Sequence, residues 1–258
     1  TVAILTAFSG LFSVFADAGI STAIAQFQDL TQDDYERLFF VSLLLGIGLA
    51  VAFFFLSMGI SWFYGDSIYV PLGALMTLSV LFNALNMVPN GVLIKERKFS
   101  LIGVRLVVCT AVVGGVVIVL AFLGLGAFAI VLQSVLTSLF VLLWNLTGSH
   151  LKMSFGDVRP VLSKVGRFSA FQFGNDAIVW LSGNADSLLV GKMFGEAALG
   201  YYNKAYNLYG YPTNILAAPI TSTLIPFLAP LQNDVDALRR KFLSVVRKVS
   251  FIVALCTA

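Results

Sequence analysis

Long apolar stretches separated by short polar segments dominate the chain. An apolar helix of about 20 residues crosses the roughly 30 Å hydrocarbon core of a bilayer, whereas barrel strands are about ten residues long and alternate apolar with polar side chains. Helices therefore fit this pattern better than strands do. It predicts eight transmembrane helices, over residues 1–27, 38–63, 71–94, 99–123, 126–147, 165–193, 197–228 and 242–258.

Composition supports an all-α, polytopic membrane protein. Hydrophobic residues make up 59% of the chain and charged residues 11%, against roughly 45–50% and about 25% in soluble domains. So few charges cannot cover a soluble globule of 258 residues. Residue 1 and Ala258 both lie inside apolar stretches, so we expect a piece of a longer chain whose first and last helices are incomplete.

The basic residues predict which connections face the cytoplasm. Segments 28–37, 95–98, 148–164 and 229–241 alternate along the chain with 64–70, 124–125 and 194–196. The first set and its flanking turns hold 13 of the 16 basic residues: Arg37, Lys95, Arg97, Lys98, Lys152, Arg159, Lys164, Arg167, Arg239, Arg240, Lys241, Arg247 and Lys248. Because Lys and Arg favour the cytoplasmic side of a membrane, we expect this first set to be cytoplasmic.

A weak internal repeat predicts two parallel lobes. Residues 20–38 resemble residues 220–238, with Phe27 matching Phe227 and Asp34 matching Asp234. The offset spans six helices, so the two copies would have the same orientation. Parallel six-helix halves are one known transporter architecture. We expect residues 1–150 to form an N-terminal lobe without its first helix, and residues 151–258 to begin a truncated C-terminal lobe.

Signatures of enzymes and of cofactor sites are absent from the sequence. Gly191-Lys192 lacks the upstream glycine of a phosphate loop, and His150 is the only histidine. Cys109 and Cys256 lie in apolar segments without metal-ligand spacing. The net charge of +3, with basic residues in short clusters, also argues against nucleic-acid binding. We therefore expect no enzyme activity, no cofactor and no nucleic-acid partner. Asn145-Leu-Thr147 fits a glycosylation sequon, but at a helix end expected to be cytoplasmic.

Polar residues inside the predicted helices point to a shared cavity. Asp17 lies nine residues before Gln26, about 14 Å from the helix end at 1.5 Å per residue, and Asp176 lies nine residues after Arg167. Buried charge in a membrane is costly and usually faces a cavity or a partner, although polar side chains also join membrane helices by packing. Four helices carry polar stripes. The candidates for the cavity are Asp17, Asn83, Asn86, Arg105, Gln172, Asn175, Asp176, Asn203, Lys204, Asn207 and Tyr211.

Two motifs resemble those of a known family. Phe15-Ala-Asp-Ala-Gly-Ile-Ser-Thr-Ala-Ile-Ala-Gln, followed by Asp29-Leu-Thr, resembles the second-helix signature of Wzx-type polysaccharide flippases. Asn184-Ala-Asp-Ser-Leu-Leu-Val-Gly, continuing to Ala198-Leu-Gly-Tyr-Tyr, resembles the turn from their seventh helix into the eighth. These flippases belong to the multidrug/oligosaccharidyl-lipid/polysaccharide exporter superfamily. The resemblance extends over nearly the whole chain in spacing.

The resemblance implies export of a lipid-linked oligosaccharide across the bacterial cytoplasmic membrane by alternating access. The sugar head group would cross between the lobes while its polyprenyl-phosphate tail stays in lipid. Arg105 and Lys204 would then be the cations for the phosphate, the tyrosines near Tyr211 would stack on sugars, and Asp17 or Asp176 would couple transport to H⁺ or Na⁺. The alternatives are a multidrug antiporter of the same superfamily, a polytopic enzyme of polysaccharide synthesis, and a membrane scaffold that transports nothing.

Overall fold

The computed structural model describes residues 2–17, 19–152, 154, 156–231 and 234–257. Side chains are described for only part of the second half of the chain, and those of residues 203, 207 and 209–223 lie outside the described set. The helices are α1 Val2–Asp17, α2 Ile20–Gln26, α3 Gln32–Tyr64, α4 Tyr69–Lys95, α5 Phe99–Phe122, α6 Ala127–Ser149, α7 Arg159–Leu228, the 3-10 helix η1 Ala229–Leu231 and α8 Val235–Thr257. The predicted all-α class is confirmed for these residues.

Five helical segments among the described residues are long and apolar enough to cross a membrane. They are Phe8–Gln26, Gln32–Phe63, Tyr69–Lys95, Phe99–Phe122 and Ala127–Ser149. The first five predicted transmembrane helices therefore have the length and hydropathy that a membrane crossing needs. Residues 165–193, 197–228 and 242–258 lie largely in the helices α7 and α8, and that these segments cross the membrane stays a prediction.

The first predicted helix, 1–27, is wrong as a single element, because the chain breaks between α1 and α2. Gly19 has a φ of 67°, a left-handed conformation that glycine adopts at little cost. A Cβ atom on Gly19 would also lie 2.7 Å from the Cβ of Gln172 and 2.8 Å from the carbonyl oxygen of Ser169. The break therefore lets α2 approach α7 closely.

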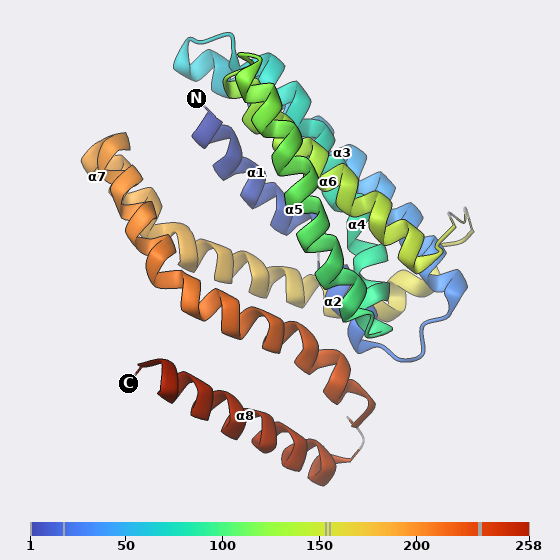
Figure 1. Ribbon diagram of the computed structural model, residues 1–258. Coiled ribbons are helices and arrows are strands. Elements are labelled where there is room, and N and C mark those ends of the chain that lie inside the picture. Colours follow the sequence, from blue (N-terminus) through green and yellow to red (C-terminus); the bar gives the residue numbers. More distant parts are fainter. Residues whose placement is uncertain (1, 18, 153, 155, 232–233, 258) are drawn as a thin grey trace.

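The predicted loop 194–196 is also wrong, because α7 runs through it without interruption. This segment holds no proline and leads into Ala197 and Ala198, and alanine is the strongest helix former. The 70 residues of α7 would measure about 105 Å if straight, over three times the roughly 30 Å hydrocarbon core. Figure 1 shows how the helix avoids this length: its ribbon turns back, so that its second half runs in roughly the reverse direction and the two halves diverge from the turn.

Two further helices begin earlier than the sequence pattern predicts. α3 begins at Gln32 rather than at residue 38, because Thr31 and Asp34 form a capping box in which each side chain accepts a hydrogen bond from the other's backbone N–H. α8 begins at Val235 rather than at residue 242, where the carboxylate of Asp234 accepts from the backbone N–H of Ala237. Polar caps at the helix starts explain both differences.

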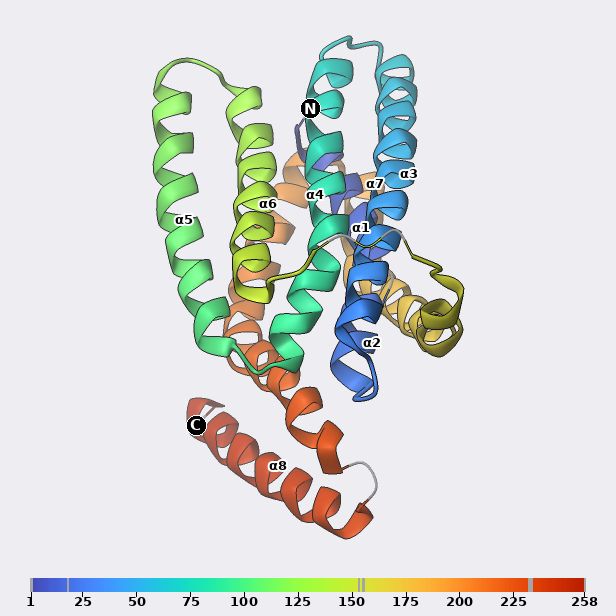
Figure 2. The same ribbon diagram turned by 90° about the vertical axis from the view of Figure 1, so that its right-hand side faces the viewer.

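α4 is the central helix of the first half of the chain. It contacts α1, α2, α3, α5, α6 and α7, and its buried face includes Leu72, Met76, Val80 and Val88. Figure 2 shows α3 and α4 side by side and α5 and α6 as a second pair, with the turns after α3 and α5 at one end. α8 lies apart from these helices in both views, below the end of α7.

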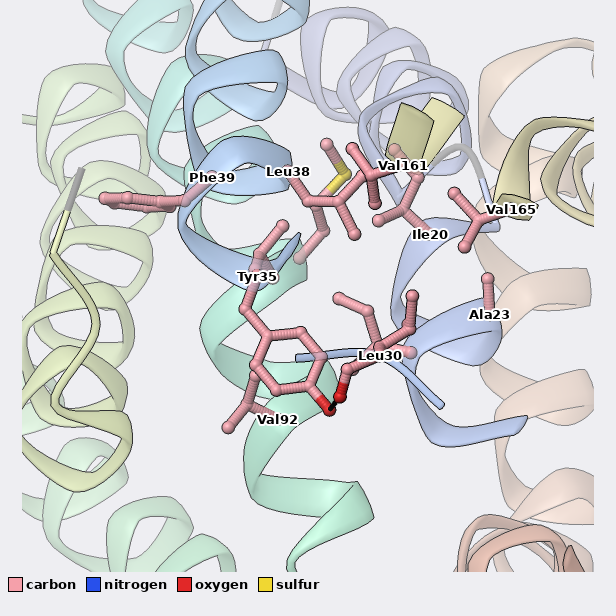
Figure 3. Close-up of a cluster of buried hydrophobic side chains, with 12 residues drawn as sticks. Ile20, Ala23, Leu30, Tyr35, Leu38, Phe39, Val92, Val161 and Val165 are labelled. Carbon is pink, nitrogen blue, oxygen red and sulfur yellow. Dashed lines mark hydrogen bonds between the residues drawn. The ribbon is translucent and has the colours of Figure 1, made fainter. Parts of the chain in front are cut away.

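Apolar side chains gather in two clusters at different heights of the bundle. The inner cluster joins α2, α3, α4 and the start of α7 through residues that include Ile20, Leu38 and Val161. Figure 3 shows these side chains converging, with the Tyr35 hydroxyl donating a hydrogen bond to the Leu30 carbonyl oxygen at the lower edge. The outer cluster joins α1, α3, α4 and α6 through Leu5, Phe53, Ile60, Tyr69, Leu72, Met76, Val80 and Val131.

Connections that the charge pattern assigns to one side of the membrane meet at the inner end of the bundle. Lys95 Nζ donates hydrogen bonds of 2.6 Å to the Phe27 carbonyl oxygen and to the Tyr35 hydroxyl. Lys98 Nζ bonds the Gly148 carbonyl oxygen, and Lys164 pairs with Asp34 at 3.5 Å. Segments 28–37, 95–98 and 148–164 therefore lie at one end. That this end is cytoplasmic stays a prediction.

Candidate functional site

A polar cavity lies between α1, α2 and α4, and is flanked by the two apolar clusters. Its volume is about 230 Å³, and its lining residues are Ser13, Asp17, Ser21, Asn83, Asn86, Met87 and Asn90. Asp17 is the central residue of the Phe8–Gln26 span, and Asn83 lies one residue from the centre of Tyr69–Lys95. Three predicted site residues, Asp17, Asn83 and Asn86, are thus brought together at mid-span.

The break between α1 and α2 positions the Asp17 carboxylate. The first N–H groups of a helix have no partner within it, and the backbone N–H of Ser21, in the first turn of α2, donates to this carboxylate. Asp17 Oδ1 is buried and has no hydrogen-bond partner among the described residues. A buried carboxylate oxygen without a donor is costly, so a ligand that donates a hydrogen bond to it, or a cation that coordinates it, would bind here favourably.

α7 brings a second carboxylate close to the first. Asp176 Oδ1 accepts hydrogen bonds from Gln172 Nε2 at 2.9 Å and from Asn175 Nδ2 at 3.4 Å. Gln172 packs against Gly19, and the Asp176 carboxylate is close enough to Asp17 to repel it electrostatically. One polar group on α7 therefore faces the α1–α2 break, formed by Gln172, Asn175 and Asp176. A polar site shared by the two halves of the chain requires such an arrangement.

A hydrogen-bonded network joins one wall of the cavity to Arg105 of α5. Arg105 Nη1 donates to Asn145 Oδ1 at 2.6 Å and to Asn90 Oδ1 at 3.2 Å. Asn145 Nδ2 in turn donates to Asn86 Oδ1 at 2.7 Å. Asn145 is fully buried in α6. Three helices are thus tied together by polar contacts inside the membrane-spanning region.

Arg105 does not line the Asp17 cavity. It lines a separate pocket of about 290 Å³ between α5 and α6, whose walls include Cys109, Thr110, Gln133 and Thr137. Its guanidinium group points to amide oxygens inside the bundle, although its side chain is long enough to reach the membrane surface. The structure thus connects Arg105 to the cavity through Asn86 and Asn90.

Four further candidates lie on α7, at Asn203, Lys204, Asn207 and Tyr211. Lys204 is exposed. Asn203, Asn207 and Tyr211 lie outside the described side chains. Their place in the cavity stays a prediction.

Five residues of the site were not among the sequence candidates: Ser13, Ser21, Met87 and Asn90, which line the cavity, and Asn145, which belongs to the network. Ser21 donates a hydrogen bond to Asp17 through its backbone N–H. A pattern of polar side chains cannot identify a backbone donor. Asn145 is a lone amide in an apolar helix, which is itself a signal, because such a group requires a partner. In the sequence, Asn145 was considered only as part of a glycosylation sequon that its expected cytoplasmic position argues against, and its need for a partner was overlooked.

Known proteins resemble this chain over nearly its whole length. Residues 1–255 match the family described as "Polysaccharide biosynthesis protein". The chain is 30% identical over 257 residues to the lipopolysaccharide biosynthesis protein WzxC of Escherichia coli, 22% identical over 241 residues to the teichuronic acid biosynthesis protein TuaB of Bacillus subtilis, and 26% identical over 247 residues to the amylovoran biosynthesis protein AmsL of Erwinia amylovora.

Each of these alignments covers 93% of this chain. The chain spans about half the length of its curated relatives, 50% of WzxC and TuaB and 61% of AmsL. No solved structure matches it significantly. The family match covers nearly every residue, including both motifs noted in the sequence and the helices that build the cavity. The chain therefore belongs to the polysaccharide biosynthesis protein family of membrane proteins.

Proposed function

We propose that the protein moves a lipid-linked oligosaccharide across the bacterial cytoplasmic membrane. The observation that carries the proposal is the polar cavity at mid-span, where Asp17 and three asparagines face a common space between apolar clusters. Hydroxyl groups of a sugar can both donate to a carboxylate and accept from an amide. Lipid can do neither, so such a cavity is costly unless water or a polar ligand fills it.

Membership of the family supports this choice of substrate. The relatives carry names in lipopolysaccharide, teichuronic acid and amylovoran biosynthesis, which are pathways that assemble glycans. A carrier of the polyprenyl-phosphate type would keep its tail in the bilayer while the sugar enters the cavity. Within the proposal the protein is a transporter that needs no enzyme activity.

The proposed mechanism is alternating access by two lobes, residues 1–150 and 151–258. Contacts between them gather around Gly19 and the inner cluster: Gln172 packs on Gly19, and the Phe27 and Phe168 rings lie 5.6 Å apart. Rocking about these contacts would open the polar group of Asp17 and Asp176 to either side. An H⁺ or Na⁺ bound between the two carboxylates would remove their repulsion and so favour their approach.

Reconstitution of the full-length protein in proteoliposomes tests the function. We expect faster translocation of polyprenyl-pyrophosphate-linked oligosaccharide than in protein-free vesicles, measured by its accessibility to an added, membrane-impermeant glycosidase. Organic-cation uptake without glycan translocation would instead establish the multidrug antiporter. Sugar transfer by the purified protein would establish an enzyme of polysaccharide synthesis.

A further inference from the structure

Arg105 dictates the orientation of the amides around it. A guanidinium group only donates hydrogen bonds, and an asparagine side chain has one acceptor oxygen and one donor nitrogen. Asn90 and Asn145 can therefore meet Arg105 only through Oδ1, as they do at 3.2 and 2.6 Å. Because the oxygen of each asparagine is bonded to Arg105, the nitrogen of each remains available for other partners.

The constraint passes through Asn145 to the cavity. With its oxygen held by Arg105, Asn145 can offer only Nδ2, and Asn86 must meet it with Oδ1, at 2.7 Å. The atoms left over on Asn86 and Asn90 are both Nδ2 groups, and both residues line the cavity. Arg105, although it lies outside the cavity, thus causes Asn86 and Asn90 to present N–H donors to it.

We propose that Arg105, through the buried Asn145, holds Asn86 and Asn90 as donors that form a subsite for a carbonyl oxygen of the transported sugar. The inference rests on the proposed function and deepens it, since it assigns a chemical preference to the same cavity. Arg105 and Asn145 are positioning residues, because they act through the amides that touch the ligand. The Asn145 side chain is fully buried, so it has no access to the ligand itself.

Asp17, on another wall of the cavity, limits which acceptor group of a ligand can bind to the two asparagines. The Asp17 carboxylate, with its buried Oδ1 lacking a donor, repels an anionic group and attracts a hydroxyl. A neutral acceptor beside a hydroxyl satisfies both walls, and the acetamido group of an N-acetylated sugar next to a ring hydroxyl has this arrangement. The cavity of about 230 Å³ lies below the roughly 300–1,000 Å³ of sites for drug-sized ligands, as expected of a subsite for one sugar ring.

The replacement Asn145→Asp tests the relay. An aspartate keeps the shape of the side chain and still accepts from Arg105, but it has no N–H for Asn86. Asn86 must then turn and donate Nδ2 to the new carboxylate, which leaves its oxygen facing the cavity. A carbonyl ligand meets an acceptor there, whereas a hydroxyl can rotate and donate to it.

The measurement is the initial rate of translocation of two probes by the full-length protein in proteoliposomes. The probes are N-acetylglucosaminyl and glucosyl pyrophosphates on the same polyprenol. Loss of one hydrogen bond typically costs 0.5–1.5 kcal/mol and an opposed acceptor costs more. For Asn145→Asp we expect the KM of the N-acetylated probe to rise about tenfold with little change in kcat, and that of the glucosyl probe to change less than about twofold.

Two further variants make the test independent of how well Asn145→Asp folds. Asn86→Asp keeps the bond from Asn145 and replaces the cavity-facing donor directly, so it should show the same selective rise in KM. In an Asn86→Leu background, Asn145→Asp should no longer change the ratio of the two KM values. Thr147→Asp is the control and should leave that ratio unchanged, because Thr147 is exposed on the same helix and lines neither the cavity nor the Arg105 pocket.

The outcomes separate the inference from the function. Selective loss of the N-acetylated probe in Asn145→Asp that disappears in the Asn86→Leu background supports the relay. Selective loss in Asn86→Asp alone overturns it, because the donor then does not depend on Asn145. Equal effects on both probes, or no effect in either variant, overturn it while the transport function stands. A wild-type protein that moves neither probe overturns the proposed function and the relay with it.

Discussion

At the residue scale, Asp17 and Asp176 are the most informative side chains. The Asp17 carboxylate interacts electrostatically with that of Asp176, and each lies among groups that a polar ligand could contact. Carboxylates inside a membrane-spanning region are expensive to keep. Their placement at the junction of α1, α2 and α7 therefore favours a role in transport over a role in packing.

Replacing either carboxylate by its amide should impair transport. Asp17→Asn and Asp176→Asn preserve shape but remove charge, and hydrogen bonds to charged groups are worth about 1.5–3 kcal/mol. We expect glycan translocation to fall at least about tenfold, with the amount of folded protein in the membrane nearly unchanged. Asp66→Asn is the control, because Asp66 is exposed and only caps a turn through Ile68. A comparable loss in that control would contradict a specific role.

Gly19 makes the second prediction at this scale. A residue with a Cβ atom at a φ of 67° is strained by about 1–2 kcal/mol, and contact with Gln172 and Ser169 adds to this cost. Gly19→Ala should therefore lower the thermal unfolding temperature of the purified protein. Gly48→Ala should not, because its added atom would meet open space within α3. An unchanged unfolding temperature for Gly19→Ala would show that the α2–α7 contact is loose.

The sequence predicted several cavity-lining residues, but it did not predict the side chains that hold them in place. Asp17, Asn83 and Asn86 were identified because polar side chains are conspicuous in apolar helices. Asn145 was missed, because its contact with Asn86 depends on how α4 and α6 pack together. The sequence of one helix does not reveal this packing. Arg105 was identified as a ligand contact, and the structure shows it bonded to Asn90 and Asn145 beside the cavity.

At the scale of elements, the length of the apolar stretches predicted well where helices occur, but it predicted poorly where several of them begin and end. α4, α5 and α6 lie within two residues of their predicted bounds, since long apolar runs and adjoining turns define both ends. The starts of α3 and α8 were predicted too late, because polar capping turns extend them beyond the apolar run. The break at Gly19 accompanies a close contact with α7, which hydropathy does not report. The continuity of α7 reflects local helix propensity, which hydropathy does not report either.

Loop orientation can be tested with single cysteines in a protein lacking Cys109 and Cys256. The basic segment at 95–98 shares the inner end with segments 28–37 and 148–164, and Lys and Arg favour the cytoplasmic side. A cysteine at Glu96 should therefore react with an impermeant maleimide only in inverted vesicles, and one at Asp66 only in intact cells. Labelling of the Glu96 position from outside would contradict the assignment.

At the scale of the whole molecule, the two parts of the chain meet mainly along α1, α2 and the first half of α7. The contacts include Phe27 with Phe168 and Phe15 with Phe173, at 5.6 and 5.1 Å between ring centroids. The sequence repeat predicted two lobes, but a repeat does not tell which surfaces touch. The overlay of residues 20–38 on 220–238 as parallel copies stays a prediction.

Alternating access requires the contacts between lobes to open. A short bis-methanethiosulfonate crosslink between cysteines at Phe27 and Phe168 should therefore stop glycan translocation, and reduction should restore it. The same crosslink between cysteines at Phe12 and Phe53, whose rings lie 5.1 Å apart within the first lobe, should leave translocation nearly intact. Full transport with the first pair crosslinked would exclude rocking about this interface.

Occupancy of the cavity by the sugar is the central claim, and substrate protection of one cysteine measures it most directly. Asn83→Cys in a protein lacking Cys109 and Cys256 places the thiol in the lining at mid-span. The measurement is its rate of modification by a small water-soluble methanethiosulfonate, with Val119→Cys on the exposed face of α5 as the control. We predict that Asn83→Cys reacts much faster than Val119→Cys, and that lipid-linked oligosaccharide slows this reaction whereas the polyprenyl phosphate without sugar does not. Failure of the thiol to react, or equal rates with and without the glycan, would contradict the account.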